Sequence, residues 1–303
     1  MRARGGEAAL LLAALIWGTC FVAQSVGLDA VGPYTFQAVR CLLGASVLTP
    51  LALWRGKSMN TTKKSGRHLL KGGICCGLVL CVATNLQQLG LVYTIPAKSG
   101  FITSMYLVLV PILSLALGKA PRLRHWLCVV LSATGLYLLS VKSGFTLNPG
   151  DTLTLIGAFF FAAQIMVVDR FAPELDGVQL SCVQFWVVGV LTAVPMFVYE
   201  TPTLAGIRAA GLPIAYAGVM SCGVAYTLQI VGQQRCEPVV ATVLMSLESV
   251  FSLLGGLILL GQVPTARELL GSCIVFSAVL LAQIPVERIM ARQREKSPVL
   301  DQS

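Results

Sequence analysis

Charged residues are scarce in this chain of 303 residues. They make up 12% of the sequence, whereas 56% of the residues are hydrophobic and the mean hydropathy is +0.80. A soluble domain carries roughly twice that share of charge, so a soluble globular protein is excluded. The apolar runs are continuous over about 20 residues, which predicts membrane-spanning helices and excludes the short alternating strands of a β-barrel.

Signatures of several other functions are also missing. No G-x-x-x-x-G-K-[ST] string occurs, so we expect no ATP-driven transport by this chain alone. The two histidines, His68 and His125, fall at the ends of apolar runs, and cysteines within the runs are expected to pack as small apolar residues. We therefore predict no metal, no cofactor and no catalytic residue. The net charge of +9 is spread over short segments, which excludes a compact basic surface for nucleic acid.

The apolar runs predict ten transmembrane helices, with both ends of the chain on one side of the membrane. Seventeen of the 22 Lys and Arg residues fall on that side and three on the other. Because basic loops stay in the cytoplasm, we expect cytoplasmic termini and a place in the plasma membrane, most simply of a bacterium. The predicted spans are 8–28, 33–54, 69–91, 97–118, 123–141, 151–169, 177–199, 209–231, 238–261 and 266–284.

One phrase occurs twice. Residues 82–90 read V-A-T-N-L-Q-Q-L-G, residues 224–232 read V-A-Y-T-L-Q-I-V-G, and a proline follows six residues after each copy. Five predicted spans separate the copies, so they run in opposite directions. The pattern predicts an all-α membrane protein of two inverted five-helix repeats, an architecture that binds solutes between its halves. Its segments are the first repeat at 8–141, a turn at 142–150, the second repeat at 150–284 and a basic cytoplasmic tail at 285–303.

Three motifs resemble those of a known transporter family. They are A-A-L-I-W-G-T-C-F-V at 13–22, K-S-G-F-I-T-S-M-Y at 98–106 and L-M-S-L-E-S-V-F at 244–251. On these motifs the chain resembles a ten-span member of the drug/metabolite transporter superfamily with two EamA-type repeats. The resemblance implies that it moves small metabolites. Two positions depart from the family pattern: Ser249 stands where proline is frequent, and Gln262 where glutamate is frequent.

Glu248 is the acidic residue near the middle of a predicted span, where a charge costs roughly 2.5–3.5 kcal/mol. Two interpretations stay open: a neutral acid that ties two helices together, and a cavity residue that binds substrate or carries a proton. Lys98 either reaches the membrane interface or faces the cavity, and we hypothesise that it forms a charged gate with Glu248. Arg40 is expected to make a structural pair, and Pro111 to kink the fourth span.

Amide and aromatic side chains share single faces of several spans. Such faces avoid lipid, so we expect them to converge on a cavity lined by spans one, three, four, six, eight and nine. Helix packing is the alternative interpretation for many of these side chains. The predicted substrate-binding residues are Trp17, Gln24, Asn85, Gln87, Gln88, Lys98, Tyr106, Gln164, Tyr226, Gln229 and Glu248.

The prediction is a secondary transporter, not an enzyme, that moves a small metabolite by alternating access. An amino acid or an amphipathic organic solute is expected, with export favoured, and proton coupling through Glu248 is a further hypothesis. One alternative is an intramembrane enzyme, which would need a Ser–His pair, a metal cluster or facing aspartates within the membrane. The other is a solute-binding protein without transport, which would need a soluble domain to pass on a signal. Substrate, direction, coupling ion and oligomeric state stay open.

Overall fold

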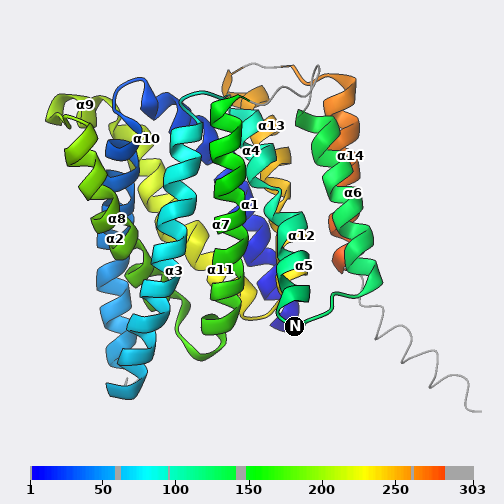
Figure 1. The fold of residues 1–303 in the computed structure, drawn as a ribbon, viewed down its shortest axis with the longest axis horizontal. Coiled ribbons are helices and arrows are strands. Elements are labelled where there is room, and N and C mark those ends of the chain that lie inside the picture. Colours follow the sequence, from blue (N-terminus) through cyan, green and yellow to red (C-terminus); the bar gives the residue numbers. More distant parts are fainter. Residues whose placement is uncertain (1, 59–62, 95, 141–147, 261–262, 284–303) are drawn as a thin grey trace, which may run out of the picture.

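The computed structural model describes residues 2–58, 63–94, 96–140, 148–260 and 263–283, and every regular element in these ranges is a helix (Figure 1). The all-α prediction is confirmed. The predicted tail at 285–303, Gln262 and most of the predicted turn lie outside the described residues.

The first half contains α1 (Arg2–Leu28), α2 (Pro33–Ser58), α3 (Lys63–Gly90), α4 (Pro96–Thr103), α5 (Tyr106–Ala116) and α6 (Leu123–Ser140). The second half contains α7 (Pro149–Phe171), the 3-10 turn η1 (Ala172–Glu174), α8 (Gly177–Tyr199), α9 (Leu204–Ala209), α10 (Gly211–Ala215), the π-helix η2 (Tyr216–Ala225), α11 (Tyr226–Gln233), α12 (Pro238–Met245), α13 (Leu247–Leu260) and α14 (Ala266–Gln283).

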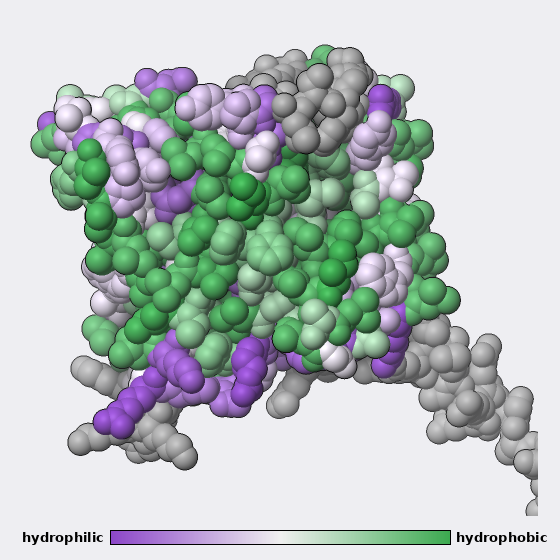
Figure 2. All heavy atoms as spheres, viewed as in Figure 1, coloured by the Kyte–Doolittle hydropathy of each residue, from purple (hydrophilic) through white to green (hydrophobic). Residues whose placement is uncertain are grey.

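The surface suits a lipid environment. Within the described ranges, eight helical segments are long and apolar enough to cross a membrane, and Leu123–Leu139 is a shorter apolar helix. The predicted tenth span, α14, is not among them, so the count of ten stays a prediction. On the face shown in Figure 2, apolar side chains form a broad band across the middle and hydrophilic side chains gather along the lower edge. A band of this kind matches the hydrocarbon core of a bilayer.

The fourth and ninth predicted spans are broken, and the breaks fall at matching positions. α4 ends at Thr103 and α5 begins at Tyr106, whereas α12 ends at Met245 and α13 begins at Leu247. The two copies of the repeated phrase are 142 residues apart (232 minus 90), an offset that aligns Ser104 with Ser246. Each serine hydroxyl donates to a backbone carbonyl of the preceding turn, at 2.9 Å and 2.7 Å respectively. Serine bonds of this type bend helices.

The break in the fourth predicted span does not fall at Pro111, where the sequence predicts a kink. Pro111 is buried inside α5, which continues through it. The break comes earlier, at Ser104 and Met105, where the serine bonds back to Gly100. A proline removes one ladder hydrogen bond, and in α5 this loss does not end the helix.

The predicted eighth span is also not a single α-helix, because it contains α10, the π-helix η2 and α11. Two glycines explain how η2 packs. A Cβ atom on Gly44 of α2 would lie 2.7 Å from the carbonyl oxygen of Gly218, and one on Gly218 would lie 2.8 Å from that of Arg40. Without side chains at these points, α2 lies directly against η2. That contact brings Arg40 and Ser221 to the same cavity.

The helices divide into a centre and two edges (Figure 1). α6 and α14 pair at one edge, where a Cβ on Gly135 would lie 2.7 Å from the carbonyl of Gly271, and α2 and α8 lie at the other. Between the edges, the broken span α4–α5 packs on α7 and the broken span α12–α13 packs on α1. In Figure 1, α4–α5 runs downward and α12–α13 runs upward.

Candidate functional site

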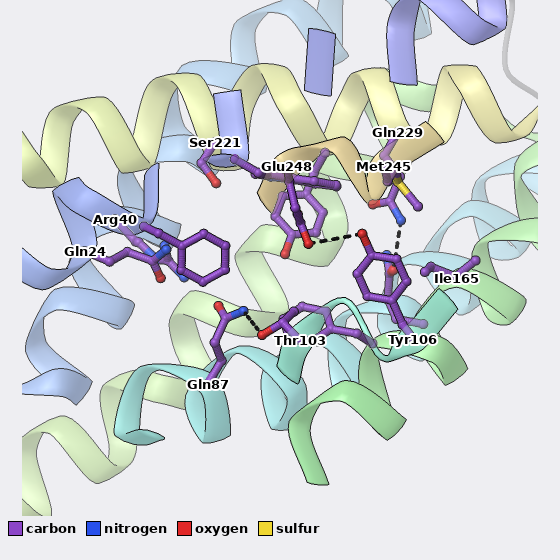
Figure 3. A pocket seen from close by; sticks show the side chains of 15 residues that line it. Gln24, Arg40, Gln87, Thr103, Tyr106, Ile165, Ser221, Gln229, Met245 and Glu248 are labelled. Atoms are coloured by element: carbon purple, nitrogen blue, oxygen red, sulfur yellow. Dashed lines mark hydrogen bonds between the residues drawn. The ribbon is translucent and has the colours of Figure 1, made fainter. Parts of the chain in front are cut away.

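A cavity lies where the two broken spans meet α1, α2, α3, α7, η2 and α11 (Figure 3). Its accessible volume is about 40 Å³, and a single water needs roughly 10–15 Å³ on that scale. The cavity therefore has room for a few waters, and it must widen to hold a metabolite. The residues that line it are Trp17, Phe21, Gln24, Arg40, Gln87, Thr103, Tyr106, Phe161, Gln164, Ile165, Ser221, Tyr226, Gln229, Met245 and Glu248.

Glu248, in the first turn of α13, is buried and is held by the broken span of the other half. Its Oε1 accepts hydrogen bonds from the Ser104 hydroxyl at 3.0 Å and the Tyr106 hydroxyl at 3.1 Å. The Ser249 hydroxyl lies 3.2 Å from that of Ser104, so the residue that replaces a frequent proline joins this cluster. Both bonds to the carboxyl group fall on Oε1. In the described part of the chain nothing bonds to Oε2, which leaves that oxygen for a solute or a proton.

Arg40 of α2 lines the same cavity and is only 4% exposed. Its Nε donates to the Oε1 of Gln37 at 2.8 Å, and its guanidinium carbon lies 5.7 Å from the centre of the Phe36 ring. The expected structural pairing is therefore present, with an amide and a ring as partners. Among the described residues no carboxylate forms an ion pair with Arg40. A buried positive charge thus faces the cavity without a negative partner.

Amide side chains form part of the wall and link neighbouring helices. Gln87 of α3 donates to Thr103 of α4 at 2.9 Å. Gln229 of α11 donates to Gln164 of α7 at 3.2 Å. The described residues offer no partner to the Nε2 of Gln164 or to the Oε1 of Gln229 and of Gln24. Because an unpaired buried polar atom is costly, these atoms favour bonding with water or a solute.

Aromatic rings close another part of the cavity. The Trp17 and Tyr226 rings meet edge to face with their centres 4.7 Å apart, and Phe185 contacts Tyr226 from behind at 5.1 Å. Within the described chain the Trp17 Nε1 is buried without a hydrogen-bond partner. Trp17 therefore adds an unsatisfied hydrogen-bond donor to this aromatic wall.

Most of the predicted substrate-binding residues come together in this cavity. They are Trp17, Gln24, Gln87, Tyr106, Gln164, Tyr226, Gln229 and Glu248. Asn85, Gln88 and Lys98 do not line it. Asn85 donates to the Thr192 hydroxyl at 2.8 Å and so links α3 to α8. Gln88 is buried elsewhere, because it follows Gln87 on α3 and is turned about 100° away from it.

The expected gate between Lys98 and Glu248 is wrong for this conformation. The Nζ of Lys98 lies 2.6 Å from the Oδ2 of Asp151, in the first turn of α7. Lys98 precedes Tyr106 by eight residues, which corresponds to about 12 Å along a helix. Since Glu248 is bonded at the level of Tyr106, Lys98 lies too near the N-terminal end of α4 to reach it.

Several residues that line the cavity are not among the predicted binding residues. Two of them, Thr103 and Met245, are related by the internal repeat. The 142-residue offset aligns Thr103 with Met245, and both line the cavity. The same offset aligns Gln87 with Gln229 and pairs Tyr106 with Glu248. The repeat gives no indication that Arg40 and Ser221 line the cavity. Their position there depends on the close contact between α2 and η2 at Gly44 and Gly218.

Residues 4–141 and 148–283 each match the EamA-like transporter family. The chain belongs to this family. A transporter of Archaeoglobus fulgidus, itself uncharacterized, is 30% identical over 91% of this chain and 85% of that protein. The uncharacterized transporter YwfM of Bacillus subtilis is 22% identical over 90% of the chain and 91% of its own length. The uncharacterized inner membrane transporter YedA of Escherichia coli is 23% identical over 91% and 90%.

A solved crystal structure shares the fold, with a TM-score of 0.76 at 20% identity over 94% of this chain and 98% of that one. The family and its relatives are transporters rather than enzymes. The protein is therefore a multi-pass membrane protein with a transporter function, and membership implies a small-molecule substrate.

Proposed function

We propose that this protein is a secondary transporter that binds a small solute in the central cavity and moves it by alternating access between two inverted repeats. One observation carries the proposal: the two helix breaks occupy matching positions and meet at the cavity through Glu248. Interrupted helices at corresponding positions of two repeats mark the binding sites of many transporters. The opposite directions of α4–α5 and α12–α13 support the inverted arrangement.

The hydrogen bonds of Glu248 would link solute binding to the separation of the two halves of the protein. Ser104 and Tyr106 belong to the first half, whereas Glu248 belongs to the second. A solute that widens the cavity must stretch or replace these bonds. Occupancy of the cavity and separation of the halves would then change together, as alternating access requires.

We also propose that Glu248 carries the proton in a proton-coupled cycle. Its Oε1 is occupied by two hydroxyl donors and its Oε2 is left for a proton or solute. For the cycle we favour export of an amino acid or amphipathic solute, with both termini in the cytoplasm. The start of α1 and the end of α14 lie on the same side in Figure 1, which supports the placement of the termini.

The test is an unbiased comparison of metabolites inside and outside cells that make the wild-type protein or Glu248→Gln. A solute whose distribution changes is then followed in proteoliposomes. We expect Glu248→Gln to lower transport about tenfold or more, as for the loss of a charged hydrogen-bonding group. Glu268→Gln is the matched control, because Glu268 is also buried but caps α14 outside the cavity. A wild-type rate that is independent of pH would refute proton coupling, and the absence of any moved solute would refute the transport function.

A further inference from the structure

A second cavity lies at the lower end of the bundle in Figure 1, where α5, α7 and α11 end and α6 and α12 begin. We call it the end cavity. Its accessible volume is about 560 Å³, against about 40 Å³ for the central cavity, and the two share no lining residue. The first half contributes the end of α5 and the start of α6, and the second half contributes the ends of α7 and α11 and the start of α12. The end cavity therefore spans the boundary between the halves.

His125, in the first turn of α6, lines the end cavity with only 2% of its side chain exposed. In the described part of the chain neither of its ring nitrogens has a hydrogen-bond partner. The Oε2 of Glu237 lies 3.8 Å from its Nδ1, beyond hydrogen-bond distance. A neutral imidazole always carries one N–H, and a buried donor without a partner is costly. This donor therefore favours an acceptor within the cavity.

Two helices start at the end cavity, α6 at Leu123 and α12 at Pro238. Neither has an acidic side chain in its first turn, and the side chain of Glu237, which precedes α12, makes no capping hydrogen bond. The first N–H groups of a helix have no partner within it. They carry a partial positive charge, so both helix starts attract an anion.

Charged side chains surround the opening of the end cavity, three basic and two acidic. Lys119, Arg122 and Arg235 are exposed residues that line it. Asp169 is already paired with Lys119 at 2.9 Å. The side chain of Glu237 is 60% exposed, so it can turn into solvent. Positive charge and hydrogen-bond donors are therefore in excess.

We propose that the end cavity binds a phosphate group, with His125 of the first half and Arg235 of the second half among its donors. A phosphate group presents three strong acceptor oxygens in different directions, and the donors here come from separate elements. A carboxylate has two oxygens in one plane and reaches fewer of them. The volume also leaves room for a body attached to the phosphate, either a soluble phosphomonoester or a lipid headgroup.

A phosphate group that contacts both His125 and Arg235 joins the two halves at this end of the protein. Its binding favours the conformation described here over any conformation in which the halves separate at this end, because a ligand stabilises the state to which it binds better. The site lies outside the central cavity, and it does not depend on the proposed transport.

The test measures the melting temperature of the purified full-length protein in a neutral detergent. The soluble probes are inorganic phosphate and glycerol 3-phosphate, with sodium chloride at equal ionic strength as the control for screening. The lipid probe is short-chain phosphatidylglycerol, with neutral phosphatidylcholine as its control. We expect at least one probe to raise the melting temperature in a saturable way above its control. Saturation by a soluble probe assigns a soluble ligand, and saturation by phosphatidylglycerol alone assigns a lipid. If no probe exceeds its control, the proposal is overturned.

Variants in each half locate the binding site. Arg235→Gln and His125→Ala should each weaken binding about tenfold or more, the loss for one charged hydrogen-bonded contact. Glu237→Gln removes a neighbouring like charge and should tighten binding several-fold. Arg55→Gln makes a matched substitution at the surface ion pair with Asp176 and should leave binding unchanged. Because Arg235 is exposed, its variant tests the site even if His125→Ala fails to fold. Unchanged binding in Arg235→Gln, or an equal loss in Arg55→Gln, would overturn the proposal.

The binding measurement is independent of transport, so the two proposals fail separately. A protein that binds phosphate as described but moves no solute would uphold the end cavity and refute the transport function. A protein that moves a solute but binds none of the probes would uphold transport and refute the phosphate site.

Discussion

The two broken spans share a register but are held in place by different forces. α4–α5 packs on α7, and an ion pair joins them at each end: Lys98 with Asp151 at 2.6 Å and Lys119 with Asp169 at 2.9 Å. α12–α13 packs on α1, where Gly18 allows close backbone contact. We call the interface of α4–α5 with α7 the charged seam, and the interface of α12–α13 with α1 the glycine seam. The difference shows that two equivalent interfaces of a duplicated fold can be stabilised differently. Ion pairs at both ends hold one interface, and close helix packing near the middle holds the other.

The repeat register shows where this difference is encoded. The 142-residue offset aligns Gly18 of α1 with Phe160 of α7, and Ala9 of α1 with Asp151 of α7. A phenylalanine keeps helices further apart than a glycine does, and an alanine has no charge to pair. Ion pairs at helix ends can exchange partners with water, whereas close backbone packing is lost as soon as helices part. We therefore expect the charged seam to separate during transport and the glycine seam to stay closed.

The largest effect is predicted for Gly18→Val in the glycine seam. A Cβ atom there would lie 2.5 Å from the carbonyl oxygen of Glu248 and 2.7 Å from the Cβ of Phe251. The helices must move apart, which lowers the free energy of unfolding by about 3 kcal/mol, the upper end of the usual cost of overpacking. The melting temperature in detergent should fall steeply, and transport should be lost because Glu248 moves with its backbone.

Gly255→Ala is the matched control in the same seam. Its Cβ would lie 3.5 Å from the Cγ2 of Thr19, an ordinary contact. Replacing a helical glycine by alanine gains about 0.5–1 kcal/mol, so this variant should be as stable as the wild type or more stable. If Gly18→Val were equally harmless, close packing would not be what holds the glycine seam.

A smaller effect is predicted for Asp151→Asn in the charged seam. Asp151 is fully buried, and it accepts bonds from Lys98, from the Thr94 hydroxyl at 2.8 Å and from the backbone N–H of Asn148 at 2.7 Å. Removing its charge should cost about 1–3 kcal/mol. Because the lost ion pair joins the start of α4 to the start of α7, amide hydrogen exchange should rise in these two segments while α13 stays protected.

Asp169→Asn tests the other end of the charged seam. Its partner, Lys119, has a side chain that is 64% exposed, and exposed ion pairs contribute at most about 1 kcal/mol. This variant should therefore change stability less than Asp151→Asn. Equal losses at both ends, or faster exchange in α13 than in α4, would contradict the assignment of the mobile seam.

The sequence predicted the helices and much of the cavity because both follow from local patterns. Apolar runs mark the helices, and the repeated phrase points to Gln87, Gln229 and their neighbours. Other features depend on contacts between distant segments. The charge of Arg40 was visible, but its position depends on Gly44 and Gly218, which are 174 residues apart (218 minus 44). Lys98 pairs with Asp151 and not with Glu248, because the bundle completely buries Asp151 although it is the first residue of the predicted sixth span.

The smallest effect is predicted for the two serines at the helix breaks, and it separates their roles. The Ser104 hydroxyl shares its one proton between the carbonyl of Gly100 and the Oε1 of Glu248, whereas the hydroxyl of Ser246 donates to the carbonyl of Val243. Each alanine substitution removes a bond to the backbone and should cost about 1 kcal/mol or less of stability. Ser104→Ala also removes a donor to a carboxylate, so it should lower transport several-fold and change its pH profile. Ser246→Ala should lose stability alone. Identical transport by the two variants would mean that the Tyr106 hydroxyl, and not that of Ser104, positions Glu248.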